Sequence, residues 1–347
     1  MTTRTALLCG AAFCLGTAAA AQDSELLVLD YPGFENPEFH QTYIDQYGDS
    51  PTYSFFGDEE EAFQKVVAGF QADVSQICAG SVMKWAESGI IEPWDTSRIA
   101  AYDDLDANLT GQEIGSETEE VFFVPQNFGA TAIAYNPDEV PEVDVQTLNV
   151  FTNPAYQGRV SMPDNVDDAF ALAYLATGVT NWTDVTDEQF DAAVDWLRQA
   201  HPNMRTYWTD PAELTQLMST GEVLVAWAWN ETYPTMVDEG RPIAYEREPA
   251  EGSSLWLCGY VNMADGAGSE DKAYDFLNAI LDHSATDALL ASGFGHANAA
   301  AMAEVDEATL EAAGIGAIDA PVLAQLPIPN DQRERQAEAF ELVKAGF

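Results

Sequence analysis

Basic residues are scarce in this sequence. The chain has 347 residues, with 13 Lys and Arg against 58 Asp and Glu, and its formal net charge is −45. Nucleic-acid-binding proteins need a basic surface that displaces counterions from phosphates, so the composition excludes that class. It also excludes adhesion to an anionic membrane surface. A strongly acidic protein attracts cations, which is a first indication about its ligands.

Long hydrophobic runs are also lacking. After the first residues, no stretch approaches the roughly 18 uninterrupted apolar residues that a transmembrane helix requires. The chain begins with Arg4 in a short basic start, an apolar run at 6–15 and small residues at 18–21. This order is typical of a secretory signal peptide, and we expect cleavage near Ala21. The predicted mature protein, residues 22–347, is therefore exported.

Cysteine is rare. Cys9 and Cys14 lie in the predicted signal peptide, so only Cys78 and Cys258 remain in the mature chain. In an oxidising compartment two cysteines predict one disulfide, provided that the fold brings them together. Two buried free thiols are the alternative.

Catalytic and metal-binding motifs are lacking as well. The four histidines form no pair at positions i and i+4 and no zinc-like cluster with cysteine, and no nucleophile-elbow, P-loop or dinucleotide-binding motif occurs. The sequence therefore predicts no enzyme, no cofactor and no metal. Acidic pairs such as Asp167 and Asp168 leave a secreted carboxylate-dependent hydrolase as an alternative. We interpret 59–61 and 164–168 as solvated helix starts, because neither has the ligand spacing of a calcium loop.

Strands and helices alternate along the mature chain, which predicts an α/β fold with mostly parallel sheets. Two such lobes with no flexible linker predict that strands cross between the lobes around a hinged cleft. We expect strands at 25–30, 52–56, 72–77, 121–124, 131–135, 160–162, 223–227 and 257–263, and helices at 35–47, 165–177, 182–199, 211–219 and 271–281.

Aromatic residues follow or precede several of these strands. Tyr31 and Phe34 follow the first strand, Trp229 follows the strand at 223–227, and Trp256 precedes the last one. In open α/β sheets ligands bind beyond the carboxyl ends of the strands. Ring faces together with acidic side chains suit an organic ammonium ion. The alternative for each ring is that it caps the core.

Several segments resemble the periplasmic spermidine/putrescine-binding proteins. Residues 124–136 resemble the strand by which that family first crosses between lobes, and 154–164 and 220–230 resemble later family segments in the same order. Trp256 and the Gly-Phe pair at 293–294 continue this collinearity. The resemblance implies a two-lobed type II periplasmic-binding-protein fold, each lobe a mixed, mostly parallel sheet flanked by helices. It further implies a periplasmic, monomeric substrate-binding protein of an ABC importer, whose partners are a small cationic amine and the permease subunits.

The resemblance also implies where the lobes divide and which residues bind ligand. Lobe 1 would comprise 22–130 plus 256–300, and lobe 2 would comprise 131–255 plus 301–347. The implied roles are ring stacking, charge pairing and pocket shaping; Glu231 is either a replacement carboxylate or a solvated rim residue. The candidates are Tyr31, Trp229 and Trp256 for stacking, Asp168 for charge, and Phe34, Asn165 and Phe294 for shape.

Three departures from the family pattern bear on the ligand. Cys258 replaces the aspartate that usually anchors an ammonium group, Asn165 stands where spermidine binders have an acid, and Gly33 stands where putrescine binders have one. Burying a second ammonium without its carboxylate is costly. We therefore expect a smaller amine, a monocation or a quaternary ammonium. An anionic or neutral solute is the alternative, since helix N-termini in such clefts attract anions.

The same resemblance makes a specific prediction about the cysteines. The strand that begins at Leu257 should run antiparallel beside the third strand, which ends at Cys78. This would place Cys78 and Cys258 within disulfide reach, at a Cα separation of roughly 4.4–6.8 Å. The bond would close a loop of about 180 residues, for which chain-entropy arguments give about 5 kcal/mol as an upper figure.

Overall fold

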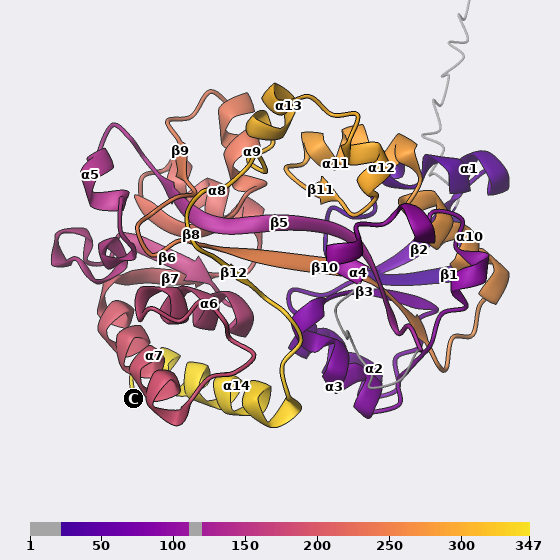
Figure 1. The fold of residues 1–347 in the computed structure, drawn as a ribbon, viewed down its shortest axis with the longest axis horizontal. Helices are drawn as coiled ribbons and strands as arrows, with labels where there is room; N and C mark the ends of the chain where they lie inside the picture. Colours follow the sequence, from indigo (N-terminus) through magenta and orange to yellow (C-terminus); the bar gives the residue numbers. More distant parts are fainter. Residues whose placement is uncertain (1–21, 111–119) are drawn as a thin grey trace, which may run out of the picture.

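Two long strands hold the two halves of the molecule together. The structure is a computed structural model that describes residues 22–110 and 120–347, so the predicted signal peptide lies outside the described residues. Strands β5 (Phe123–Tyr135) and β10 (Ser253–Met263) pair antiparallel and run across the middle of the molecule (Figure 1). The strands follow the order β2-β1-β3-β10-β5-β8-β6-β7, so both halves share one sheet. The architecture is a type II periplasmic-binding-protein fold, as the sequence predicted.

The first lobe is built on a parallel group of strands. Strand β1 pairs parallel with both β2 and β3, and β10 closes the group antiparallel to β3. Its elements are β1 (Gln22–Asp30), α1 (Gln41–Tyr47), β2 (Ser50–Phe55), α2 (Glu59–Val67), β3 (Val74–Cys78), α3 (Val82–Glu87), β4 (Ile91–Glu92), α4 (Ala107–Thr110), α10 (Glu270–Ile280), α11 (Thr286–Ala291), β11 (Gly295–His296) and α12 (Ala299–Met302).

The second lobe is also built on a parallel group of strands with an antiparallel neighbour. Strand β6 pairs parallel with both β7 and β8, and β8 pairs antiparallel with β5. Its elements are α5 (Glu142–Val145), β6 (Val160–Pro163), α6 (Val166–Ala176), α7 (Asp187–Ala200), β7 (Met204–Trp208), α8 (Pro211–Ser219), β8 (Val225–Trp229), α9 (Thr232–Asp238), β9 (Ala244–Glu246), α13 (Glu307–Ala312), β12 (Val322–Ala324) and α14 (Asn330–Lys344).

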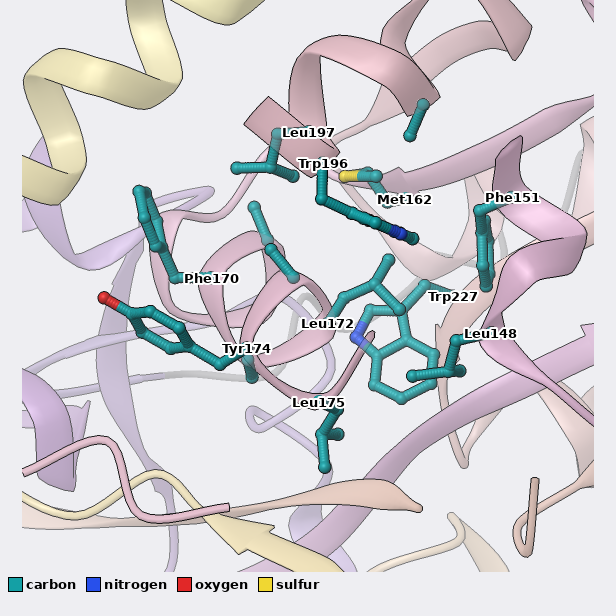
Figure 2. Close-up of a cluster of buried hydrophobic side chains, with 14 of the residues drawn as sticks. Leu148, Phe151, Met162, Phe170, Leu172, Tyr174, Leu175, Trp196, Leu197 and Trp227 are labelled. Carbon is teal, nitrogen blue, oxygen red and sulfur yellow. The ribbon is translucent and has the colours of Figure 1, made fainter. Parts of the chain in front are cut away.

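Helix α6 is the centre of the second lobe's core. All its residues from Val166 to Leu175 are buried, because apolar side chains cover every face of the helix. Phe170 stacks on Phe190 of α7 with ring centroids 5.5 Å apart, and Trp227 of β8 fills the space beneath the helix (Figure 2). A helix packed on all sides cannot shift easily, so its N-terminus is held firmly where it meets the cleft.

Several strands extend further than the sequence predicted. The strands expected at 121–124 and 131–135 are one continuous β5, and the strand expected at 223–227 is β8, shifted to 225–229. Trp229 and Trp256 therefore lie on strands instead of beside them. Pairing across the interlobe sheet extends these segments, and single-chain patterns do not report such pairing.

The predicted helices differ mainly at their first residues. Helix α6 is capped by Asn165, whose side chain accepts hydrogen bonds from two backbone amides of the first turn. The helix expected from 182 begins only at Asp187, after a capping box formed by Thr186 and Gln189. The helix expected at 35–47 is a 3-10 turn (Pro37–Phe39) followed by α1. Local side-chain capping marks the start of α6 and of α7, whereas α1 begins after His40 without a side-chain cap.

The predicted disulfide is present. Strand β10 lies antiparallel beside β3, and Cys258 stands directly opposite Cys78 in the register. The two residues are bonded across a sequence separation of 180, with Cα atoms 3.9 Å apart. This separation is shorter than the predicted range. The bond ties a strand that crosses between the lobes to a strand of the first lobe.

Removing the bond should lower the stability of the protein without changing its fold. We expect the Cys78→Ser/Cys258→Ser variant to lose about 2–5 kcal/mol of unfolding free energy in urea titrations. Reductant should destabilise the wild-type protein to a similar extent and leave the variant unaffected. Non-reducing peptide mapping should recover the two cysteines in one linked fragment, and two free thiols in the oxidised protein would contradict the assignment.

Candidate functional site

A cavity of about 1290 Å³ opens between the two lobes. Its walls come from the loop after β1, the start of α2, the ends of β3 and β8, the start of α6, and the crossing strand β10. All the ligand-binding residues predicted from the sequence line this cavity: Tyr31, Phe34, Asn165, Asp168, Trp229, Glu231, Trp256 and Phe294.

Asp168 is the most firmly held acid in the cavity wall. Its Oδ1 accepts hydrogen bonds from Thr131 Oγ1 at 2.7 Å and from Gln325 Nε2 at 3.1 Å, and its Oδ2 accepts from Trp229 Nε1 at 2.7 Å. Burial raises the pKa of Asp168 to about 6, although these three donors oppose the rise. The donors fix the carboxylate in one orientation, and Oδ2 keeps room for a further partner.

Aromatic rings surround this acid. Trp229 packs edge-to-face against Trp208 with ring centroids 4.6 Å apart, so its indole is fixed in orientation. Trp256 packs over the backbone of β5 at Gly129. A Cβ atom at Gly129 would lie 2.2 Å from Trp256 Cζ2 and 2.4 Å from Asn230 Oδ1, so only glycine fits beneath the Trp256 indole. The two indoles are thus built into the cavity by their surroundings.

Glu231 provides the second carboxyl group of interest. It follows β8 directly and lies partly buried on the cavity wall. No hydrogen bond or ion pair reaches its carboxyl group from residues 22–110 and 120–347. Burial alone raises the pKa of Glu231 to about 8. An unpaired carboxyl in an enclosed site is protonated near neutral pH until a cation arrives to pair with it.

The prediction of solvated helix starts is wrong for three acids. Glu59, Asp167 and Asp168 are each only 3% exposed. Asp167 receives two hydrogen bonds from Arg333 Nη1 of α14, at 2.6 and 2.8 Å, and Arg333 Nε donates to Glu60 Oε1 at 3.1 Å. The sequence analysis missed Arg333, because it lies 166 positions from its partner and no local pattern links the two.

This ion cluster also joins the two lobes at one edge of the cavity. Asn165 Nδ2 lies 3.4 Å from Glu59 Oε2, so the residue that caps α6 also contacts the first turn of α2. Burial and the negative charge of Asp167 raise the pKa of Glu59, whereas Arg333 lowers it. Glycine is required at Gly80, since a Cβ there would lie 2.9 Å from Asp167 Oδ2. The lobes therefore meet closely along this edge.

The cavity is strongly acidic. Among the described residues that line it, nine are acids and Arg241 is the single basic residue. The acids are Asp58, Glu59, Glu61, Asp164, Asp167, Asp168, Asp210, Glu231 and Glu239. A cleft lined by one sign of charge concentrates ions of the opposite sign. The arrangement therefore favours a cation.

Neither a metal-binding cluster nor a membrane-spanning helix occurs among the described residues. Over 22–110 and 120–347, no group of three or more His, Cys, Asp or Glu side chains is arranged to hold a metal ion. Over the same residues, no helix combines the length and the apolar character that crossing a bilayer demands.

The buried ion pair leads to a stability prediction. Arg333→Met leaves the Asp167 carboxylate buried without its cation, and such a loss costs about 3–5 kcal/mol of unfolding free energy. We expect the matched double variant Arg333→Met/Asp167→Asn to recover most of that loss, because it leaves no uncompensated charge. Urea titration of the wild type and the three variants measures the coupling. Strictly additive effects of the two single substitutions would show that the pair contributes nothing.

Comparison with known proteins places this geometry in a family. Residues 52–313 match the bacterial extracellular solute-binding protein family. The spermidine/putrescine-binding periplasmic protein of Escherichia coli (strain K12) is 24% identical over 280 residues, covering 79% of this chain and 78% of that protein. A putrescine/agmatine-binding protein of Pseudomonas aeruginosa is 26% identical, covering 72% of this chain and 71% of that protein.

Solved structures share the fold. The spermidine/putrescine ABC transporter substrate-binding protein PotD of Streptococcus pneumoniae superposes with a TM-score of 0.71 at 18% identity, covering 93% of this chain and 99% of that chain. MotA of A. tumefaciens B6, solved with glucopine, superposes with a TM-score of 0.74 at 18% identity, covering 92% of this chain and 99% of that chain. The hydrolase alternative has no support in these relatives. The match over residues 52–313 shows that the chain belongs to the bacterial extracellular solute-binding proteins, a non-enzymatic family.

Proposed function

We propose that this protein is the periplasmic substrate-binding protein of an ABC importer, and that it captures a small organic amine with a single ammonium centre, primary or quaternary. The signal peptide would be removed near Ala21, and the mature monomer would deliver its ligand to the permease subunits. The polyamine-binding names of the relatives support an amine in general. The residues of this cleft support one cationic centre.

The proposal rests on two acids that line the same cavity as two indoles. One acid is held in a single orientation, and the other has no hydrogen-bonding or charged partner among the described residues. Asp168 is oriented by three donors and Glu231 has no partner in the described structure, while Trp229 and Trp256 line the same cavity. Indole faces attract cations, most strongly where water is excluded. Cys258 lies on another wall of the cavity and is bonded to Cys78. This position therefore provides no carboxylate for a second ammonium group.

The alternative of an anionic or neutral ligand has less support. Arg241 is the single base among the described lining residues, and it is exposed at the rim. An anion would have to enter a site where the ionised Asp168 opposes it and where no basic residue other than Arg241 lines the cavity in the described structure. Helix N-termini do reach the cavity, but the first turns of α2 and α6 both carry acids that cancel this attraction.

Ligand capture would work by closing the two lobes. We propose lobe 1 as residues 22–130 plus 256–300 and lobe 2 as residues 131–255 plus 301–347, with the chain crossing in β5 and β10. A ligand that contacts both lobes stabilises the closed state over the open one by its difference in affinity for the two. The Asn165–Glu59 contact supports this division, because it joins the two lobes beside the cavity.

A thermal-shift screen tests the proposed ligand class. We expect small monoamines or quaternary ammonium compounds to raise the melting temperature by about 5 °C at a concentration of about 100 times the dissociation constant. Sugars, dicarboxylates and neutral amino acids should have no effect. A response to long polyamines alone would show that the single-ammonium assignment is wrong, and a response only to anions would overturn the amine.

Trp229 offers a matched pair of controls for this screen. Trp229→Ala removes the ring and the donor to Asp168, so it should abolish both the ligand-induced fluorescence change and the thermal shift. Trp229→Phe keeps an aromatic face and loses only the donor, so binding should be weakened and not abolished. Both empty variants should melt close to the wild type, since the Trp229 side chain is only partly buried.

The raised pKa of Glu231 predicts a pH dependence. A bound cation favours the ionised carboxylate, so affinity for a quaternary ammonium should rise about tenfold from pH 7 to pH 9 and binding should release protons. The empty folded protein holds a proton that the unfolded chain has lost, so its stability should fall as pH rises through about 8. Glu231→Gln should remove both effects. Calorimetry in buffers of different ionisation enthalpy measures the protons; a flat wild-type profile would contradict this role.

A further inference from the structure

Two buried side-chain amides face the cavity without partners. Gln76 of β3 and Asn127 of β5 are both 0% exposed, and both line the cavity. Neither the oxygen nor the nitrogen of either amide has a hydrogen-bonding partner among the described residues. Buried polar groups in folded proteins are nearly always paired, so four unpaired atoms in one cavity wall require an explanation.

These amides share one face of the sheet with the disulfide. Asn127 stands opposite Cys258 in the register, Cys258 stands opposite Cys78, and Gln76 lies two residues before Cys78 on the same strand. Directly opposed residues and residues two apart on one strand point to the same side. Trp256 also lies on this face, two residues before Cys258, and its Nε1 donor has no acceptor in the described structure.

The polar side chains of Tyr260 and Asp30 nearby are engaged with each other. Tyr260, which stands opposite Gln76, donates its hydroxyl to Asp30 Oδ2 at 2.7 Å, and the backbone amide of Tyr31 donates to Asp30 Oδ1 at 2.8 Å. Apolar rings form another part of the cavity lining. Phe34 stacks on Phe294 with centroids 5.4 Å apart and packs against Phe39 at 5.7 Å. Within the described structure, the two amides are therefore unpaired polar groups in a cavity that is partly lined by aromatic rings.

We propose that Gln76 and Asn127 form a second subsite, which binds an uncharged hydrogen-bonding group at the far end of the ligand. This inference rests on the proposed function: the ammonium group lies against Asp168 and Glu231, and the tail reaches the first-lobe wall. The tail is a hydroxyl or a carboxamide, because the two amides and the Trp256 indole together offer donors and an acceptor. The ligand class is thus amino alcohols and amino amides.

The charges around the subsite exclude an ionised tail. A second ammonium would find neutral amides and the disulfide on this face of the sheet. Asp30 is engaged by Tyr260 and does not line the cavity. Glu59, which does line it, already accepts a hydrogen bond from the backbone amide of Cys78 at 3.3 Å. A carboxylate would enter an acidic cleft with no basic residue lining this wall in the described structure. A purely alkyl tail would leave all four amide atoms unpaired. An uncharged polar tail is the one that pairs them.

A matched ligand series tests the subsite. Calorimetry on the wild-type protein would compare amino alcohols and amino amides, from propyl to hexyl, with alkylamines, diamines and amino acids of the same chain lengths. At the best chain length we expect the amino alcohol or amino amide to bind at least about tenfold more tightly than the alkylamine, and the diamine and amino acid to bind more weakly still. A site built to hydrogen-bond a group discriminates against analogues that lack it.

Two variants and a matched control assign the preference to these residues. Gln76→Met and Asn127→Leu remove the amides at similar volume. Each should reduce the preference over the alkylamine several-fold, because the polar tail loses its partner and the alkyl tail no longer leaves an amide unpaired. Gln126→Leu is the control, because Gln126 is a buried amide of the same strand as Asn127 that does not line the cavity. It should leave the preference intact. Melting curves of each empty variant verify folding.

The outcomes separate this inference from the proposed function. Binding of all the amines without preference for a polar tail would overturn the subsite and leave the amine-binding function standing. Binding of none of the ammonium compounds would overturn the proposed function itself. If the amide variants fail to fold, the wild-type ligand series still decides, because equal affinity for the amino alcohol and the alkylamine contradicts the subsite.

Discussion

The antiparallel pairing of β5 with β10 is the constraint on which the rest of the structure depends. Each strand runs from one lobe into the other, so the cavity forms where their shared ladder crosses between the halves. Side chains on one face of this ladder, among them Trp256, Cys258 and Asn127, become the cavity wall. Gly129 allows Trp256 to lie flat against the neighbouring strand, because any larger side chain would collide with the indole. The backbone pairing of β5 with β10 therefore also determines the geometry of the site.

Charge is arranged differently on the two sides of the cavity. At one edge, Arg333 pairs with Asp167 and Glu60, so acids from both lobes are neutralised and the lobes are held together. Deeper in the cavity, Asp168 is oriented by neutral donors, and Glu231 has no partner in the described structure. The two groups of acids have different consequences, because burial with a cation stabilises the fold whereas burial without one prepares a site for a cation.

The disulfide connects the fold to the chemistry of the site. The resemblance implies that Cys258 stands where the family carries an acid, so that a neutral disulfide would take the place of a charged anchor. The amides of Gln76 and Asn127 lie on the same face of the sheet, so this face is polar there without being charged. The Cys78–Cys258 bond joins β3 of the first lobe to β10, one of the two strands that cross between the lobes.

Much of the fold could be predicted from the sequence, because alternating apolar runs and helix caps are local signals. The resemblance added the positions of Asp168, Trp229 and Trp256, which the structure brings together around one cavity. The extent of β5 and β8 could not be predicted, since pairing with distant strands extends both. The pairing of Arg333 with Asp167 could not be predicted either, because it joins segments with no local pattern in common.

The sequence by itself determined the acidic character, the α/β alternation and the candidate aromatic and acidic residues, since these depend on composition and on neighbours along the chain. Only the tertiary structure decided which acids are paired, which are left unpaired and which amides are buried against the cavity. These properties depend on burial and on contacts between residues far apart in the sequence, such as Asp168 with Trp229 and Asp167 with Arg333, and burial changes the free energy of charged and polar groups.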